Sequence, residues 1–282
     1  MSKLKIMSNN IWYCDDNQPA WEAAGEDCSA EHRSKGLSRL YSETRPDILG
    51  LQECSALMAD CLMQQFAEKG EPYALLWGKD TPIIYRTDKF ELVDSFFSLF
   101  PEGVPGLEGK FNNHKTKSYC IAVLRDKESG KKLIFTSVHL WWKSSNPKSK
   151  DFYPHSDEAR AWQLQYVMDK VEAYQNKYTC PAIIVGDYNA VYDSPAVQGG
   201  LKRGYQHAHD IAVEYAAQTG GHHFCYASGY DMYENKREFK NSIDHILISG
   251  APEGFVRRFD REAPDYYMPL SDHIPVWIEA EL

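Results

Sequence analysis

Several short apolar segments of this chain run directly into Asn, Glu, His or Asp, and this recurrence constrains the fold more than any other feature. The polar residues at these segment ends are Asn10, Glu53, His139, Asp187, Asn189, Asp244, Asp272 and His273. One such ending is an ordinary turn, but Glu and His are poor turn residues. The recurrence therefore indicates polar groups that are placed at strand ends for a shared purpose.

The segment "AIIVGDYNA" at residues 182–190 illustrates the pattern. Its apolar run predicts a strand buried on both faces, and the run continues into Gly186. Because side chains alternate along a strand, Asp187 and Asn189 are expected to point the same way while the extended geometry lasts. A plain turn of Gly, Asp and Asn is the alternative for this segment alone.

The remaining pattern predicts strands that arrive singly and in hairpins, with helices between some of them. Helices are predicted over 29–44, 55–70 and 154–177, the last with Ser156 as its N-cap, and around 206–217. Residues 127–130 predict a hairpin turn. Strict β-α alternation is missing, so we expect an α+β fold of two packed, mixed and mostly antiparallel sheets with helices outside. No boundary stands out, which predicts one domain over residues 1–282.

Composition and charge narrow the range of partners. The chain has 282 residues, of which 43% are hydrophobic, as in an ordinary globular protein. Its formal net charge is −9 and its pI is about 5.6. A protein that binds duplex DNA through its phosphates normally presents a basic surface. The charge argues against a non-specific DNA binder without excluding a nucleic-acid substrate.

The cysteine and hydropathy patterns predict a cytoplasmic protein. The seven cysteines form no Cys-x-x-Cys pair, which argues against metal knuckles and a disulfide scaffold and favours free thiols in a reducing compartment. The N-terminal residues lack the apolar core of a signal peptide. No run of about 18 apolar residues occurs, so no membrane association is expected.

The polar segment ends resemble, in order, a known family. "MSNNIW", "LQE", "VHL", "GDYNA", "SIDHI" and "LSDHIP" are similar to the motifs of the endonuclease/exonuclease/phosphatase superfamily, which includes pancreatic deoxyribonuclease, sphingomyelinases and inositol polyphosphate 5-phosphatases. The resemblance covers residues 4 to 279. It implies a four-layer α/β/β/α sandwich with its site at one edge of the sheets, and hydrolysis of phosphate esters that depends on Mg²⁺ or Mn²⁺.

The residues also fit that chemistry in their own right. Mg²⁺ prefers oxygen ligands and needs only one or two carboxylates, so Glu53 is the expected ligand, with Asn10 and Asp272 near it. His273 suits the deprotonation of water near neutral pH. Asp244 is expected to orient its imidazole through a hydrogen bond. The oxygen-rich set argues for a hard ion over zinc.

Three further residues are expected to act on the phosphate. Asp187 and Asn189 are expected to contact the phosphate and the attacking or leaving oxygen. His139, which stands where AP endonucleases carry Tyr, would donate a hydrogen bond or a proton to the phosphoryl group. Asp80 lies where some members of the superfamily place a carboxylate that braces this histidine.

Contacts to the rest of the substrate are predicted from the segment after His139. Trp141, Trp142 and Lys143, with Lys148 and Lys150, would form a wall that attracts phosphate, and Arg160 would bind a second phosphate. Solvated loops and surface ion pairs are the alternatives.

The sequence therefore predicts a phosphoesterase whose water is activated by His273 and whose substrate is a small phosphodiester or phosphomonoester. A nuclease acting on single-stranded or short nucleic acid is the main alternative. A catalytically inactive binding module is a third, although none of the expected site residues is missing. Sequence patterns leave the physiological substrate and the oligomeric state open.

Other histidines are predicted to be structural. His245 is expected to face away from Asp244 on its strand. His207 and His209 would lie about 200° apart on a helix, so they cannot share an ion there. His222 and His223 are expected to form a loop pair.

Overall fold

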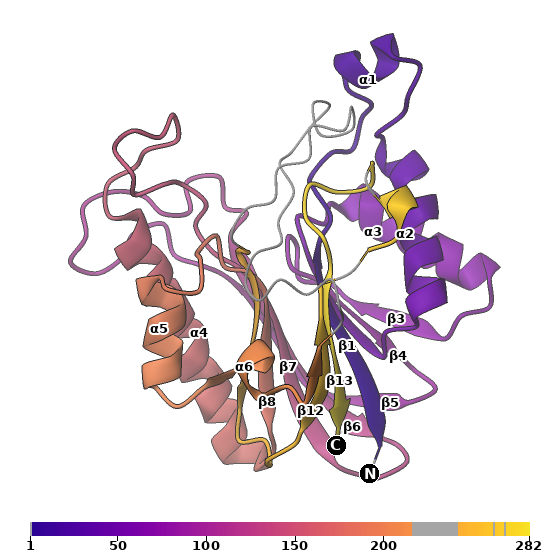
Figure 1. The fold of residues 1–282 in the computed structure, drawn as a ribbon, viewed down its shortest axis with the longest axis vertical. Helices are drawn as coiled ribbons and strands as arrows, with labels where there is room; N and C mark the ends of the chain where they lie inside the picture. The colour runs from indigo at the N-terminus through magenta and orange to yellow at the C-terminus, as the bar shows by residue number, and fades with distance from the viewer. Residues whose placement is uncertain (1, 216–241, 262, 268) are drawn as a thin grey trace.

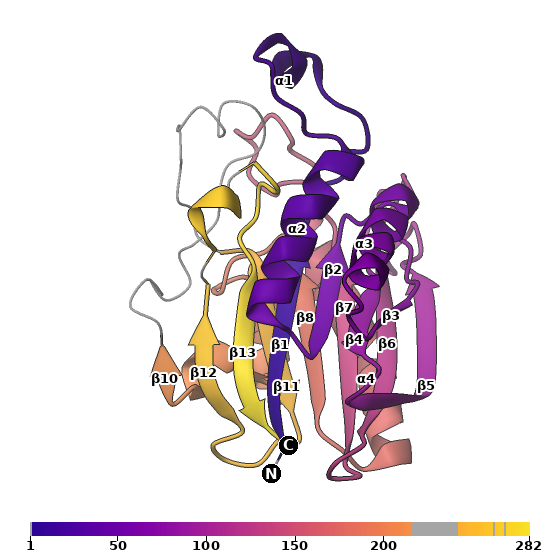
Figure 2. The ribbon, with the colours of Figure 1, turned by 90° about the vertical axis from the view of Figure 1, so that its right-hand side faces the viewer.

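A computed structural model describes residues 2–282 except 216–241, 262 and 268. Two β-sheets pack face to face, and helices cover the outer face of each sheet (Figure 1). The perpendicular view shows strands running from the end that holds both chain termini toward the end beneath α1 (Figure 2). The predicted four-layer α/β/β/α sandwich is confirmed.

The first sheet, sheet A, brings the beginning and the end of the chain together. Its strands, in spatial order, are β10 (Glu214–Tyr215), β12 (Val256–Asp260), β13 (Val276–Glu281), β1 (Lys3–Asn10), β2 (Ile48–Gln52), β4 (Ile83–Arg86) and β3 (Tyr73–Leu76). Strand β1 is parallel to β2 and antiparallel to β13. The early and late segments of the sequence therefore share the centre of one sheet.

The second sheet, sheet B, is built around one parallel pair. Its strands, in spatial order, are β5 (Phe90–Leu99), β6 (Ser118–Asp126), β7 (Lys132–His139), β8 (Ala182–Asp187), β11 (Asp244–Ser249) and β9 (Gln206–His207). Strands β7 and β8 are parallel, and their neighbours pair with them in antiparallel fashion. The predicted hairpin turn joins β6 to β7, with Gly130 at a φ of +72° that favours glycine.

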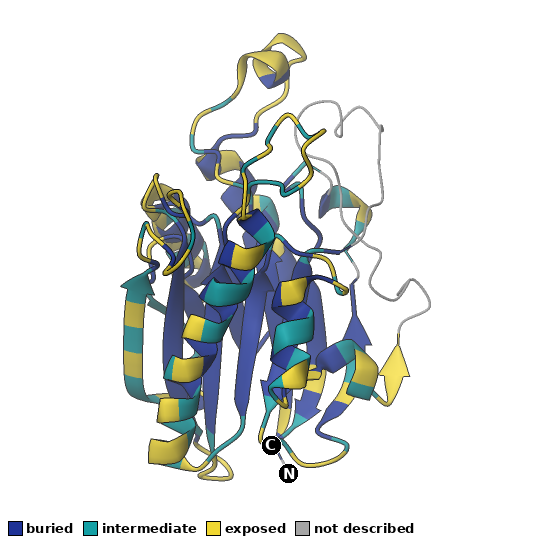
Figure 3. Ribbon diagram, turned by 90° about the vertical axis from the view of Figure 1, so that its left-hand side faces the viewer, coloured by how far each residue is buried: buried dark blue, intermediate teal, exposed yellow. Residues whose placement is uncertain are grey.

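Helices cover the sheets in pairs. Helices α2 (Ala30–Thr44) and α3 (Ala56–Glu68) pack on sheet A, whereas α4 (Ser156–Tyr178) and α5 (Pro195–Lys202) pack on sheet B. The outer sides of α4 and α5 are exposed, and the sheet behind them is buried (Figure 3). Shorter elements are α1 (Pro19–Ala23), α6 (Ala208–Ile211) and a 3₁₀ turn at Asp265–Tyr267.

The alternation of side chains along each strand fills both sides of each sheet. In β8, Ile183 and Val185 lie in the core between the two sheets, while Ile184 packs beneath α4 and α5. In β1, Ile6 faces the other sheet, and Met7 packs with α2 and α3. Each fully buried side chain of this kind stabilises the fold by about 1.5–3 kcal/mol.

A polar bridge joins the two sheets below the edge where the predicted site residues gather. Gln52 of β2 accepts a hydrogen bond from Ser8 at 3.3 Å and donates one to Ser137 of β7 at 3.0 Å. Ser137 in turn donates to the carbonyl oxygen of Leu51 at 2.8 Å. Because these groups are buried and satisfy one another's hydrogen bonds, the bridge fixes the position of β2 relative to β7 of the facing sheet.

Two local predictions are wrong. Ser156 is not the N-cap of α4, because His155 takes that place and the Ser156 hydroxyl instead donates to the carbonyl oxygen of Tyr153. The helix predicted around 206–217 is mostly replaced by short strands, and only residues 208–211 are helical. Residues 216 and 217, like His222 and His223, lie outside the described residues.

In the described part of the chain, every helix is too short or too polar to cross a bilayer.

Gly186 is expected to be indispensable for the pairing of β8 with β7. A Cβ atom at Gly186 would lie 1.9 Å from the carbonyl oxygen of Val138, which is backbone and cannot move aside. We expect Gly186→Ala to lower the free energy of unfolding by about 3 kcal/mol in urea denaturation. Gly103→Ala, where no atom lies within 4 Å of the added carbon, is the control. Equal stability of the two variants would contradict this close approach.

Candidate active site

Strand alternation brings the predicted site residues of four strands to one edge of the sandwich. Each lies an even number of residues from a core residue of the same strand. Because side chains alternate along a strand, its side chain points the same way as that core residue, toward the opposite sheet. The pairs of core and site residue are Ile6 and Asn10 in β1, Phe135 and His139 in β7, Val185 and Asp187 in β8, and Ile246 and Asp244 in β11. The same pleat that buries the apolar residues therefore aims these polar ones.

Glu53 reaches this edge only because the backbone leaves the strand geometry. Gln52 faces the other sheet, so a continued strand would turn Glu53 toward α2 and α3. Instead Glu53 has a φ of +58°, in the left-handed region. Its carboxylate accepts hydrogen bonds from the Asn10 side chain at 3.2 Å and from the Tyr13 N–H at 2.9 Å. This conformation costs a non-glycine residue about 1 kcal/mol.

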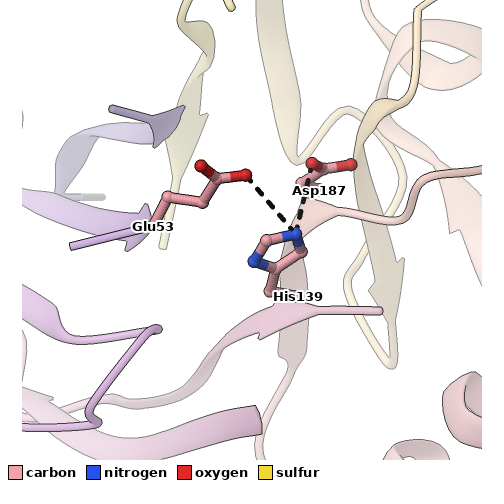
Figure 4. Close-up of side chains that lie close together, drawn as sticks. All are labelled: Glu53, His139 and Asp187. Carbon is pink, nitrogen blue, oxygen red and sulfur yellow. Dashed lines mark ion pairs between the residues drawn. The ribbon is translucent and has the colours of Figure 1, made fainter. Parts of the chain in front are cut away.

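The Asp187 carboxylate lies at the centre of the cluster. It accepts a hydrogen bond from Asn10 Nδ2 at 3.0 Å, and it lies 3.5 Å from His139 Nε2 and 3.8 Å from His273 Nε2. Figure 4 shows Glu53 and Asp187 directed from different strands at the same nitrogen of His139, with the Glu53 oxygen at 3.9 Å. Residues separated by most of the sequence thus meet within a few ångströms.

Burial and charge act in opposite directions on these two carboxylates. Burial raises the pKa of Asp187, and His273 and His139 only partly oppose that effect. Burial alone would also raise the pKa of Glu53. However, His139, Lys117 and the Tyr13 N–H together lower it to about 2. Glu53 is therefore ionised across the physiological range.

His273 is held by a buried carboxylate. Its Nδ1 lies 2.7 Å from Asp244 Oδ2, the arrangement predicted from the sequence. Burial disfavours the charged ring, but Asp244, Asp272 and Asp187 outweigh that cost and raise the pKa of His273 well above its ordinary value. The hydrogen bond to Asp244 leaves Nε2 as the nitrogen nearer to Asp187.

His139 is braced on both sides. Its Nδ1 lies 2.6 Å from Asp80 Oδ2, so Asp80 occupies the bracing position expected for it. The ammonium of Lys117 lies 2.5 Å from Nε2 and 3.1 Å from Nδ1, so it approaches the face of the ring and not the lone pair of either nitrogen. The Lys117 ammonium therefore brings N–H groups of its own to the site beside His139.

Lys117 was missed by the sequence analysis. It is buried and immediately precedes β6, whose antiparallel partner β7 ends at His139. Because Tyr119 pairs with Val138, regular alternation would turn the Lys117 side chain to the face opposite His139. The contact therefore depends on the local backbone ahead of β6, which the sequence pattern does not reveal.

Asp272 and Asp244 each keep a carboxylate oxygen unused. Asp272 Oδ1 and Asp244 Oδ1 are buried and have no hydrogen-bond partner among the described residues. Burial raises the pKa of Asp272 to about 6, and Glu53 and Asp187 add to the shift. Such crowding of carboxylates is costly unless a cation shares the site.

The donor set fits a divalent cation. Two groups of side chains are close enough to ligate one ion: Glu53, His139 and Asp187, and Asp187, Asp244 and His273. Carboxylate oxygens outnumber nitrogens in both groups, which suits a hard ion. Asn10 is turned the other way, because its Nδ2 faces the carboxylates and its Oδ1 accepts from the Trp12 N–H at 3.0 Å. It would offer an oxygen only after rotation of the amide.

Asn189 lies in a tight turn directly after β8. Its N–H donates to Asp187 Oδ1 at 2.7 Å, and its φ is +49°. Its side-chain Nδ2 donates to the carbonyl oxygen of Leu140 at 3.2 Å. The turn interpretation of "GDYNA" is therefore confirmed, because Asp187 ends the strand and Asn189 lies in the turn that follows it. A common action of the two side chains stays a prediction.

Two of the predicted substrate contacts are not available to a substrate. Trp141 is only 2% exposed, packs with Phe111, and donates through its indole N–H to Ser156. Arg160 is 4% exposed and donates to the carbonyl oxygens of Trp141 and Lys143 while pairing with Asp157. Both side chains stabilise the loop after β7, so the predicted contacts are wrong for this structure.

The neighbouring residues of that loop remain at the surface. Trp142 is 39% exposed, and the Lys143 ammonium lies 3.9 Å from the centre of its ring. Lys143 also lies 3.5 Å from Asp151. The aromatic and basic surface expected near His139 therefore rests on Trp142 and Lys143.

His245 and His207 lie behind the turn after β8. His245 lies on the face of β11 opposite Asp244, and its Nε2 donates to the carbonyl oxygen of Ala190 at 2.7 Å. Its Nδ1 lies 3.0 Å from His207 Nε2. His209 contacts His207 through its backbone N–H. These contacts agree with the structural role predicted for His245.

The pattern of a known family covers this cluster. The model of the Endonuclease/Exonuclease/phosphatase family matches residues 10–273 of the chain. The match begins at Asn10 and ends at His273, so every side chain of the cluster lies within it. Among curated proteins, the CCR4-Not complex 3′-5′-exoribonuclease subunit Ccr4 of Candida albicans is 24% identical over an alignment of 236 residues that covers 70% of this chain and 29% of that protein. The chain thus spans less than a third of the curated relative it matches.

Solved structures share the fold. A mannosyl-6-phosphatase of Bacteroides thetaiotaomicron superimposes with a TM-score of 0.71 at 20% identity, over 99% of this chain and 100% of that chain. D. rerio TDP2, solved with a single-strand DNA product, superimposes with a TM-score of 0.65 at 20% identity over the whole of both chains. At this level of identity the likeness concerns architecture alone.

The raised pKa of Asp272 predicts a pH effect on stability when no cation is present. The pKa rises from 3.8 in its ordinary state to about 6, so the folded chain binds this proton more tightly than the unfolded chain. Its stabilising contribution is complete below about pH 4 and is lost as the pH rises through 6. We therefore expect Asp272→Asn to be more stable than the wild type above pH 6 in EDTA.

The measurement is thermal denaturation from pH 4 to 8, with and without Mn²⁺. An advantage of Asp272→Asn on the order of 1 kcal/mol at pH 7.5 in EDTA is expected, and Mn²⁺ should reduce or reverse it. Asp265→Asn, at an exposed position, is the control. A variant that is less stable than the wild type throughout this range in EDTA would refute the carboxylate crowding.

Proposed function

The chain belongs to the endonuclease/exonuclease/phosphatase family, and we propose that it hydrolyses a small phosphodiester or phosphomonoester with the aid of a divalent metal ion. Hydrolysis of phosphate esters is the activity of this family. The observation that carries the proposal is the pair of His273 and Asp244, which are 2.7 Å apart, beside the buried carboxylate of Asp187. A base, its orienting acid and a cation site then share one sheet edge.

We assign the metal site to Glu53 and Asp272. Glu53 is ionised because its pKa is lowered to about 2, and Asp272 has a buried oxygen without a partner. Asn10 would add an amide oxygen after rotation. A bound Mg²⁺ or Mn²⁺ would supply Lewis acidity toward the phosphoryl oxygens and lower the pKa of water.

His273 is proposed to receive the proton of the attacking water on Nε2. Asp244 accepts the hydrogen bond of Nδ1–H, which fixes the ring and stabilises its protonated form. In the protein without a cation, the surrounding carboxylates raise the pKa of His273 and keep it protonated. Added positive charge among those carboxylates opposes that effect and favours the neutral ring that a base requires.

Lys117 is proposed to stabilise the charge that develops on the phosphoryl oxygens. Its ammonium lies 2.5 Å from His139 Nε2 and has N–H groups to offer to the phosphate. His139 then acts by positioning Lys117, with Asp80 fixing the ring from the other side. This assignment revises the expectation that His139 itself donates. Asp187 and Asn189 keep their proposed roles around the attacking and leaving oxygens.

Charge supports a small substrate. The formal net charge of −9 disfavours long-range attraction of a polyanion. One fold neighbour is named for a phosphorylated sugar and another was solved with single-strand DNA, so the fold is used for both substrate classes. We therefore rest the preference for a small ester on the charge of this chain.

A nuclease that acts on single-stranded or short nucleic acid is the second proposal. Trp142 and Lys143 stack on each other in the loop that begins directly after His139, the last residue of β7. An exposed aromatic ring with a cation beside it suits a base and its phosphate. An inactive binding module is the least favoured alternative, because none of the residues expected for catalysis or metal binding is missing from the sequence. We further propose a single catalytic domain over residues 1–282 and a cytoplasmic location.

A panel of substrates tests the proposed function. Bis-nitrophenyl phosphate, nitrophenyl phosphate, a single-stranded oligonucleotide and a plasmid are assayed with Mg²⁺, Mn²⁺ or EDTA. We expect turnover of a small ester that EDTA abolishes, and a loss of at least about 10³-fold in kcat in His273→Gln. His245→Gln, on the opposite face of β11, is the matched control.

Two results of the panel would change the proposal. Cleavage of the oligonucleotide alone would favour the nuclease. Comparable turnover by His273→Gln, while circular dichroism shows a folded protein, would remove His273 from the mechanism.

Lys117 is expected to matter for the chemical step. Lys117→Met should lower kcat by about 10²-fold, because one preorganised donor to the developing charge is lost. Lys110→Met is the control, since Lys110 is exposed and pairs with Glu102 at 2.9 Å. Unchanged kcat in folded Lys117→Met would return the donor role to His139. A change confined to KM would assign Lys117 to binding.

A further inference from the structure

A segment of the N-terminal region forms a small structure of its own above the site. This segment, which we call the cap, comprises residues 11–29 and carries α1 beyond the ends of the sheets (Figures 1 and 2). Its apolar interior consists of Cys14, Trp21 and Cys28, with Trp12 packed against them. So few buried residues stabilise a segment only weakly, and small structures of this kind usually need a covalent or metal staple.

Two cysteines face each other in that interior. The sulfur atoms of Cys14 and Cys28 lie 3.8 Å apart, and the residues are 7% and 0% exposed. Gln18 holds both sulfurs, because its N–H donates to Cys28 Sγ at 3.4 Å and its side-chain Nε2 donates to Cys14 Sγ at 3.6 Å. In the described part of the chain, these are the only two thiols with a contact between them.

Arg33 fixes the backbones of both cysteines independently of their sulfurs. Among the described residues, its buried guanidinium donates to five backbone carbonyl oxygens, those of Ile11, Trp12, Cys14, Cys28 and Leu270. The two ends of the cap are thereby held together at the base of α2. Because Arg33 keeps the cysteines adjacent, a bond between them would require little rearrangement of the chain.

We propose that Cys14 and Cys28 are a thiol–disulfide redox pair that staples the cap. The oxidant is a low-molecular-weight disulfide, such as oxidised glutathione. One cysteine thiolate attacks it, forms a mixed disulfide and releases one small thiol. The second cysteine then attacks the protein sulfur of that mixed disulfide, which forms the Cys14–Cys28 bond and releases the second small thiol. Two protein thiols are oxidised, and one external disulfide is reduced to two thiols.

The exchange is expected to be gated by opening of the cap. Both sulfurs are buried, and burial raises the pKa of Cys14 to about 11, so little reactive thiolate is present while the cap is closed. A reducing cytoplasm would keep the pair as the free thiols expected from the sequence. Under oxidising conditions the Cys14–Cys28 disulfide would form slowly and would then keep the cap closed.

The pair also lies next to the site, and this part of the inference rests on the proposed function. Tyr13, one residue before Cys14, donates its N–H to the Glu53 carboxylate at 2.9 Å. Asp15, one residue after Cys14, accepts a hydrogen bond from the hydroxyl of Ser55. A staple at Cys14 would therefore restrain the chain that holds Glu53, the proposed metal ligand.

Mass spectrometry tests the pair directly. The protein is equilibrated in glutathione buffers from reducing to oxidising, alkylated, and cut with trypsin, which releases residues 6–33 with both cysteines in one peptide. We expect the oxidised peptide to carry no alkyl groups. Its mass should be lower by two hydrogen atoms than that of the reduced, unalkylated peptide. Cys14→Ser and Cys28→Ser should lose this species, and Cys61→Ser, whose sulfur contacts no other thiol among the described residues, should retain it.

The contrary result is equally clear. A wild-type peptide that still carries two alkyl groups or two glutathione adducts in the most oxidising buffer, while the protein remains folded, would overturn the proposal. Because the wild type alone decides this point, poor folding of either serine variant leaves the test intact.

Hydrogen exchange tests the connection to Glu53 without metal or substrate. Amide hydrogens of residues 12–14 are expected to exchange several-fold more slowly in the oxidised than in the reduced protein. Cys14→Ser and Cys28→Ser should show no redox dependence. Equal exchange in both states, with the disulfide formed, would overturn the link between the staple and Glu53. None of these measurements depends on turnover, so failure of the phosphoesterase proposal would be recognised separately.

Discussion

The packing of two sheets against each other is the constraint from which the site follows. Burial of the apolar face of each strand decides which of its side chains point toward the other sheet. The polar residue at the strand end follows the same alternation and therefore points the same way. A shift of β8 by one residue would place Asp187 beneath the helices instead of beside His139. The bridge of Ser8, Gln52 and Ser137 ties the two sheets just below the site, where such a shift would do most damage.

The same geometry gathers more negative charge than the protein neutralises. Glu53, Asp187, Asp244 and Asp272 meet around His139, His273 and Lys117. Burial raises the pKa of Asp187 and of Asp272, so this charge is maintained at a cost in folding free energy. A binding site for a divalent cation is the form in which such a cost is commonly tolerated.

The sequence predicted the sandwich and the residues that gather at its edge because both depend on period and order, which a single chain displays. It did not reveal contacts that depend on three-dimensional neighbours. Lys117 reaches His139 across a hairpin, and the burial of Trp141 and Arg160 depends on how the loop after β7 folds against α4. Strands β3 and β12 were also missed, since segments this short become strands only through their partners. The Ser156 error has a similar origin, because its hydroxyl is drawn to Tyr153 and Trp141.

The left-handed backbone at Glu53 carries a strain that the surroundings of its carboxylate offset. Glycine would adopt that conformation without strain, but it would also remove a carboxylate that His139, Lys117 and the Tyr13 N–H stabilise in its ionised form. Glu53→Gly is therefore not a simple route to a more stable protein. Stabilising substitutions should be sought in the helices and kept away from the strand tips.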